Sequence, residues 1–188
     1  MDDFESYNDI PDGEPGSKLI YMTWIDGFYN PEINGCTIGE VTGVSMEIPP
    51  ITHSGSYSMP FYYNNSRQAH YSEATASAAK LEINRDWIKN GVQTLSLWFY
   101  GNPYNVLDQM YVALANDGGP TGTIFYDDLK VILSETWTEW TVPLKEFSKQ
   151  GVVLTNIDTI SIGFGDKNNP KSGGSGKMYF DDIRLYRL

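Results

Sequence analysis

Acidic side chains stand near both ends of the chain, and their spacing could hold a cation. Asp3 and Glu5 flank Phe4, so on an extended strand their two carboxylates project to the same side. Asp181 and Asp182 lie close to the other end of the chain. If the two ends pair in a sheet, these carboxylates converge, and they repel one another unless a hard cation such as Ca²⁺ lies between them. The sequence therefore predicts a structural calcium ion, with a set of solvated acidic side chains as the alternative.

Aromatic side chains that alternate with aliphatic ones could bind a ligand. In the segment 94–100, two leucines and Phe99 share one face of a strand, whereas Trp98 and Tyr100 share the other. Several rings on one sheet face form a platform. Such a platform suits a sugar, because the C–H faces of sugar rings lie on aromatic faces while the hydroxyls bond polar side chains. The predicted ligand-binding residues are Trp24, Tyr62, Arg67, Trp98, Tyr100 and Tyr104.

The same rings have a structural alternative. Rings on the outer face of a sheet also pack beneath loops, and the long segment 25–50 is rich in turn-forming dipeptides. Trp137 and Trp140 are expected to be structural in this way. Tyr111 is expected to point outward from its strand, and the polar side chains expected to bond sugar hydroxyls beside Arg67 are Asn64, Asn65 and Glu73.

The residues that common hydrolytic mechanisms need are largely missing. His53 and His70 are the only histidines, and the sequence contains neither a Gly-x-Ser-x-Gly nor a His-Glu-x-x-His motif. Carboxylates on expected strands are few, and the paired arrangement that glycosidases use is not evident. The acidic candidates are Glu73, Glu82, Glu135, Glu139 and the pair Asp127-Asp128, which is interpreted as a turn. The sequence favours a binding protein over an enzyme.

Charge and cysteine content narrow the possible partners. The chain has 188 residues, with 13 Lys and Arg against 24 Asp and Glu, and a formal net charge of −11. Such a charge repels phosphate backbones and acidic lipid headgroups, so neither nucleic acid nor a membrane is expected as a partner. Cys36 is the only cysteine, so no disulfide can form within the chain.

The elements that must position these residues are short strands. The chain contains 13 Tyr, 8 Phe and 5 Trp together with 18 Gly and 10 Pro, a mixture typical of all-β domains with many turns. We expect a single jelly-roll β-sandwich domain over residues 1–188, built from about ten antiparallel strands. The expected strands lie around Phe4 and at 18–24, 56–63, 71–83, 94–100, 109–115, 122–126, 129–133, 137–143, 157–164 and 177–188. A short helix is expected at 144–150.

Three segments together resemble the landmarks of calcium-containing jelly-roll carbohydrate-binding modules. They are Asp3-Phe4-Glu5, the run from His53 to Met59, and the run from Tyr179 to Leu185. In that family a Glu and an Asp bind the ion and a backbone carbonyl completes the shell. The resemblance therefore implies that the metal ligands in this sequence are Asp3, Glu5, Ser56 and Asp181. Asp181 is preferred to Asp182 because it has the parity of Ile183 and Leu185, which are expected to point inward.

The resemblance also implies a function. Modules of this kind adsorb to a polysaccharide without cleaving it. Modules appended to secreted polysaccharide-degrading proteins also contain segments similar to Trp24-Ile25-Asp26-Gly27-Phe28. The resemblance therefore implies a monomeric, extracellular module that is fused to, or excised from, a larger protein. Two alternatives stay open: a jelly-roll glycoside hydrolase or polysaccharide lyase, and a structural or adhesion domain that binds protein.

Overall fold

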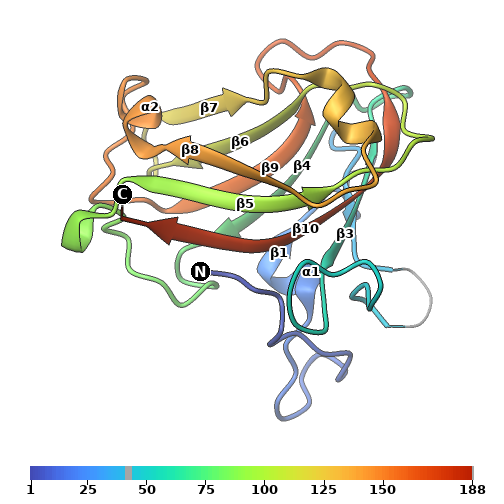
Figure 1. Cartoon of the computed structure of the whole chain (residues 1–188), viewed down its shortest axis with the longest axis horizontal. Helices are drawn as coiled ribbons and strands as arrows, with labels where there is room; N and C mark the ends of the chain where they lie inside the picture. The colour runs from blue at the N-terminus through green and yellow to red at the C-terminus, as the bar shows by residue number, and fades with distance from the viewer. Residues whose placement is uncertain (41–43, 188) are drawn as a thin grey trace.

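Two antiparallel five-stranded sheets pack face to face in the computed structural model (Figure 1), which describes residues 1–40 and 44–187. The predicted all-β sandwich is therefore confirmed. The first sheet has the order β1 (Trp24–Ile25), β4 (Tyr71–Ser77), β9 (Thr159–Gly165), β6 (Met110–Ala115) and β7 (Thr121–Phe125). The second sheet has the order β2 (Thr37–Ile38), β3 (Met59–Asn64), β10 (Ser175–Tyr186), β5 (Thr94–Tyr100) and β8 (Thr138–Pro143).

The helices are single short turns that connect or cap strands. They are α1 (Ile20–Thr23), η1 (Lys89–Gly91), η2 (Leu129–Leu133) and α2 (Leu144–Ser148), the last of which lies within the predicted helix 144–150. Within residues 1–40 and 44–187, no helix has the length and apolar character that a bilayer crossing requires.

Three predicted strands are wrong. In the segment 18–24, residues 20–23 form α1 and Trp24 begins β1, because burial of Ile20 and Thr23 favours a helical spacing there. The segment 129–133 forms η2, since the Asp128 side chain accepts a hydrogen bond from the Lys130 N–H and caps the turn. Around Phe4 the chain makes a single bridge, Asp2 to Ile183, because Phe4 itself has a positive φ of 60° that interrupts an extended strand.

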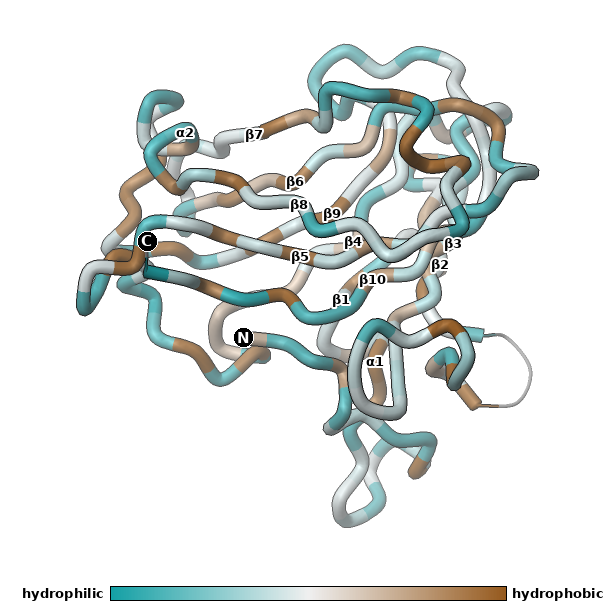
Figure 2. The backbone as a smooth tube through the Cα atoms, in the orientation of Figure 1, coloured by the Kyte–Doolittle hydropathy of each residue, from teal (hydrophilic) through white to brown (hydrophobic). Residues whose placement is uncertain are grey.

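The core follows the two-residue period of the strands. Leu95, Leu97 and Phe99 of β5 are fully buried between the sheets, as the alternation predicted. Met110, Val112 and Leu114 fill the same layer from β6. Figure 2 shows this pattern as hydrophobic stretches that interrupt hydrophilic ones along β5 and β10.

A β-bulge in β10 changes the side on which Asp181 lies. Phe180 pairs with Phe99 in the core and Asp181 pairs with Trp98, but the register shifts between Asp181 and Arg184. Asp182 in this bulge has a φ of 48°. The extra residue places Asp181 on the outer face of the second sheet while Ile183 returns to the core. The prediction that Asp181 shares the side of Ile183 was therefore wrong.

Candidate functional site

The outer face of the first sheet is a floor of small side chains. The pairing register aligns its outward residues in three rows across β4, β9, β6 and β7. The rows are Glu73, Gly163, Tyr111 and Phe125; Thr75, Ser161, Ala113 and Thr123; and Ser77, Thr159, Ala115 and Thr121. Because two of the three rows carry only hydroxyl or methyl side chains, the floor is low and rich in hydroxyl groups.

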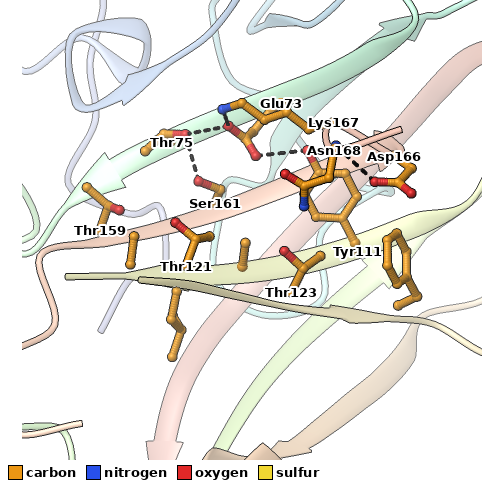
Figure 3. Close-up of a pocket in the computed structure, with 14 residues that line it drawn as sticks. Glu73, Thr75, Tyr111, Thr121, Thr123, Thr159, Ser161, Asp166, Lys167 and Asn168 are labelled. Carbon is orange, nitrogen blue, oxygen red and sulfur yellow. Dashed lines mark hydrogen bonds and ion pairs between the residues drawn. The ribbon is translucent and has the colours of Figure 1, made fainter. Parts of the chain in front are cut away.

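Two adjoining hollows lie over this floor. One, of about 220 Å³, extends over β6, β7 and β9 to the loop residues Asp166, Lys167 and Asn168 (Figure 3). The other, of about 450 Å³, extends over β4 to Ile25 at the β1 edge. The two hollows share Glu73, Thr75 and Thr159 as lining residues. We call the combined depression the trough. At roughly 4.8 Å between neighbouring strands, it crosses about 19 Å of sheet.

Glu73 is the centre of a polar cluster in the trough. It is only 8% exposed. Tyr111 Oη donates a hydrogen bond to Glu73 Oε2 at 2.8 Å, and Lys167 Nζ donates one to Oε1 at 2.6 Å (Figure 3). The Tyr111 ring reaches Glu73 by lying over Gly163, where a Cβ atom would stand 2.3 Å from Tyr111 Cζ. Glycine at this position is therefore a condition for the cluster.

The surroundings raise the pKa values of both hydrogen-bond donors to Glu73. Burial and the neighbouring Glu73 carboxylate raise the pKa of Tyr111, so its phenol stays a neutral donor. Burial acts to lower the pKa of Lys167, but the hydrogen bond and charge of Glu73 outweigh it and the net pKa is raised. Both oxygens of Glu73 thus accept hydrogen bonds, one from the buried Tyr111 and one from the half-exposed Lys167.

Three threonine hydroxyls of the trough are available to a ligand. In the part of the chain that the structure describes, Oγ1 of Thr121, Thr123 and Thr159 bonds no other protein group, whereas Thr75 and Ser161 lie 2.7 Å apart and bond each other. Phe125, which is 37% exposed, adds an apolar surface at the β7 edge. The trough therefore combines free hydroxyls, a fixed ion pair and one accessible ring.

Trp24 is not accessible to a ligand, which corrects the prediction for this residue. It is 0% exposed, and its indole Nε1 donates a hydrogen bond to Asp2 Oδ2 at 2.9 Å. Trp24 pairs with the buried Ala76, so it occupies the inward position of β1 while Ile25 points outward.

Tyr62, Trp98 and Tyr100 lie on the outer face of the second sheet, away from the trough. All three are half-buried. The His53 ring stacks on Trp98 with centroids 3.7 Å apart, and the Tyr62 hydroxyl donates to Glu40. A structural role therefore fits Trp98 better than contact with a ligand. The residue that packs on its ring is His53, not a residue of the segment 25–50.

Arg67 and Tyr104 lie in two further places. Arg67 is exposed in the loop between β3 and β4, where it lines another hollow. Tyr104, which is 91% exposed, lies in the loop between β5 and β6. The six predicted contact residues do not form one surface. Sequence reasoning did single out Glu73 as a polar contact and Tyr111 as an outward-pointing residue. It missed the trough, because the pattern that marks it, Thr, Ser, Ala and Gly at alternate positions, resembles an ordinary solvated strand.

The three landmark segments do meet in space. Glu5 Oε1 accepts hydrogen bonds from the backbone N–H groups of Ser56 and Tyr57, each at 2.9 Å. The buried Asp181 accepts N–H groups of His53 and Ser54 on Oδ2, at 2.9 and 3.2 Å. Its Oδ1 accepts the N–H of the next residue at 2.7 Å. The turn 53–57 is thus held between two carboxylates.

These contacts do not supply the oxygen ligands that a calcium ion requires. One oxygen of Glu5 accepts the N–H of Ser56, and both oxygens of Asp181, whose pKa burial raises to about 6, accept N–H groups. Asp3 is exposed, and Asp182 bonds His53 and Arg184 instead. Within the described residues, no group of three or more His, Cys, Asp or Glu side chains could hold a metal ion. The predicted donor set does not fit calcium in this arrangement.

Comparisons with known proteins identify the fold. No family model and no curated protein matches the sequence. Among solved structures, the family 11 carbohydrate-binding module of the cellulosomal cellulase Lic26A-Cel5E of Clostridium thermocellum is 18% identical, with a TM-score of 0.53 over 88% of this chain and 94% of that one. The family 30 module of the cellulosomal cellulase Cel9D-Cel44B of the same organism is 10% identical, with a TM-score of 0.52 over 79% of this chain and 85% of that one.

Two further structures extend the comparison. A family 11 module from Clostridium thermocellum in complex with a β-1,3-1,4-mixed-linked tetrasaccharide is 19% identical, with a TM-score of 0.52 over 88% of this chain and 95% of that one. An exo-β-agarase is 12% identical, with a TM-score of 0.57 over 88% of this chain but only 25% of the enzyme. The chain therefore has the β-sandwich fold of carbohydrate-binding modules.

Proposed function

We propose that the chain is a carbohydrate-binding domain that adsorbs to a neutral polysaccharide through the trough. The observation that carries this proposal is the continuous depression over all five strands of the first sheet, with free hydroxyls along it and the Glu73 cluster fixed within it. The fold supports the proposal, since one similar module was solved with a bound tetrasaccharide.

The residues of the trough provide what sugar recognition needs. Threonine hydroxyls and Lys167 exchange hydrogen bonds with sugar hydroxyls, and Phe125 receives the C–H face of a ring. Because Tyr111 and Lys167 are held by Glu73 before any ligand arrives, little side-chain entropy is lost on binding. Adsorption of this kind raises the effective concentration of a linked or co-secreted enzyme near its substrate.

The charge of the protein sets the class of glycan. The net charge of −11, together with Glu73, Asp166 and Asp26 along the trough, repels uronate polymers. Among the described residues, the basic side chains that line it are Lys167, which is paired with Glu73, and Lys80. We therefore propose neutral chains such as β-glucans, xylans or mannans as ligands.

Some of the remaining expectations from the sequence enter the proposal and others do not. An extracellular, monomeric module fused to a larger protein agrees with the cellulosomal source of two structural relatives. An enzyme is less well supported, because a glycosidase needs two carboxylates about 5 to 10 Å apart with one free to move a proton, and Glu73 accepts fixed donors on both oxygens. The half-buried rings Tyr62 and Tyr100 are not the platform that we propose, and the calcium ion forms no part of the proposal.

Affinity electrophoresis in gels that contain soluble polysaccharides tests the proposal. We expect retardation on at least one neutral polymer and none on alginate. Thr123→Val removes one free hydroxyl of the trough without changing the shape of the side chain, and should weaken binding about 2- to 10-fold. Thr141→Val is the matched control, because Thr141 lies on the edge strand β8 of the other sheet. Migration of the wild type unchanged on every polymer would contradict the function, and equal effects of the two variants would contradict the site.

A further inference from the structure

Exposed apolar side chains are concentrated in the segment around β1, at one end of the trough. The segment 21–33 carries six large apolar side chains that are each at least 42% exposed: Tyr21, Met22, Ile25, Phe28, Tyr29 and Ile33. Soluble proteins seldom expose apolar groups so densely unless the surface binds something. We call residues 25–33 the apolar arm.

The arm is continuous with the trough. Ile25 pairs with Thr75, so it extends the row that runs through Ser161 and Ala113 to Thr123. Met22 and Ile25 also line the larger hollow together with Glu73 and Thr75. A ligand lying along the trough therefore meets the arm when it reaches β1.

Hydrogen bonds fix the arm to the strand that carries Glu73. Asn34 Nδ2 donates to the Glu73 carbonyl and Asn34 Oδ1 accepts the Glu73 N–H, both at 2.8 Å. The Asp26 carboxylate accepts the N–H groups of Phe28 and Ile38, at 3.0 and 2.8 Å. A Cβ atom on Gly27 would stand 1.9 Å from the Asn34 carbonyl oxygen, so the loop closes tightly there.

Phe28 and Tyr29 project from this fixed loop into solvent. They are 62% and 90% exposed, and their ring centroids lie 5.3 Å apart at an interplanar angle of 88°. Rings held outward on a rigid loop lose little entropy when they bind. The occupant must also suit the polar groups of the adjoining hollow, among them Asp26, Asn34 and Lys80. A sugar chain has both apolar ring faces and hydroxyls, whereas a purely apolar partner would leave these polar groups unsatisfied.

We propose that the apolar arm is a second part of the glycan site, in which sugar rings of the chain that lies in the trough stack on Phe28 and Tyr29. The inference rests on the proposed function and adds to it a site beyond the β1 edge. It implies that long chains contact both parts, whereas short oligosaccharides fit within the trough alone.

Binding measurements on Phe28→Ala, Tyr29→Ala and the double variant test the arm. With the neutral polysaccharide that retards the wild type, we expect the double variant to bind about 10-fold more weakly. Disaccharides of the same sugar should bind the double variant and the wild type equally. Tyr186→Ala, at the end of β10 in the other sheet, is the aromatic control and should change neither affinity. Because the arm residues are exposed, melting curves of all variants should match the wild type.

The possible results separate the two proposals. If the wild type binds no polysaccharide, the proposed function fails and the arm with it. If the wild type binds and Thr123→Val weakens binding while the double variant binds like the wild type, only the arm is refuted. Loss of self-association in the double variant, at unchanged polysaccharide affinity, would also refute it, because the patch would then be a protein interface.

Discussion

Asn34 pairs with the main chain of Glu73 in both directions, donating to its carbonyl and accepting from its N–H at 2.8 Å. A single side chain thus replaces the hydrogen bonds that a neighbouring strand would make on this part of β4. Through this pair, the loop that carries the exposed aromatic rings and the strand that carries the central carboxylate of the trough become one rigid unit.

Removing the Asn34 side chain should destabilise the protein. Asn34→Ala leaves the N–H and C=O of Glu73 without these partners and also removes the bond from the Cys36 N–H, at a cost of about 2 to 3 kcal/mol in the free energy of unfolding. Chemical denaturation monitored by fluorescence measures this change. Asn169→Ala, in an exposed loop, is the control and should lie within about 0.5 kcal/mol of the wild type. A similar stability for both variants would show that the pair does not hold the loop.

A methyl group at position 163 should disturb the Glu73 cluster. In Gly163→Ala the new Cβ meets Tyr111 Cζ at 2.3 Å and the Ser72 carbonyl oxygen at 2.7 Å, so the ring must move and its bond to Glu73 breaks. We expect a loss of about 1 to 3 kcal/mol in stability and weaker polysaccharide binding. The double variant Gly163→Ala, Tyr111→Ala should lose less than the sum of the single variants, because the two groups compete for the same space. Strict additivity would be evidence against the contact.

The Glu73–Lys167 pair should be insensitive to pH through the neutral range. Glu73 holds the pKa of Lys167 above its ordinary value of 10.5, against the opposing effect of burial. A basic group whose pKa is raised by folding stabilises the folded protein fully at pH values below its pKa in the unfolded chain. This stabilisation is lost as the pH rises through the pKa of the group in the folded protein. The stability difference between the wild type and Lys167→Met should therefore be constant from about pH 6 to 9 and shrink above about pH 10.5. A difference that already changes between pH 6 and 9 would show that another group controls the pair.

Chelation tests the calcium ion that the family resemblance implies. An ion bound only to the native state raises the melting temperature by mass action. Because N–H groups occupy both oxygens of Asp181 and one oxygen of Glu5, we expect the same melting temperature in EDTA and in millimolar calcium chloride. A lower melting temperature in EDTA that calcium restores would instead support the ligand set of Asp3, Glu5, Ser56 and Asp181. Elemental analysis of the purified protein provides an independent check.

Local sequence patterns were sufficient for much of the fold. Alternation of apolar and polar side chains placed β5 and β6 and identified their buried faces, because side chains on a strand alternate with a period of two whatever lies around it. The abundance of aromatic and turn-forming residues indicated an all-β sandwich, because aromatic side chains favour strands while Gly and Pro favour turns. The predicted strand or strand face was wrong where a local backbone feature interrupts this period, as the positive φ of Phe4 and the bulge at Asp182 do.

The location of the site depended on contacts between distant parts of the chain. Alternation correctly turned Trp98 away from the core, but it contained no information on what covers the outer face. His53, whose N–H bonds Asp181 at a separation of 128 residues, brings its ring onto Trp98 and covers that part of the second sheet. Whether the outer face of the first sheet keeps its trough depends on where the loops lie, and only tertiary packing determines their position. The sequence by itself thus determined which side chains leave the core, and the tertiary structure decided which of them remain accessible, since burial on an outer face results from long-range packing.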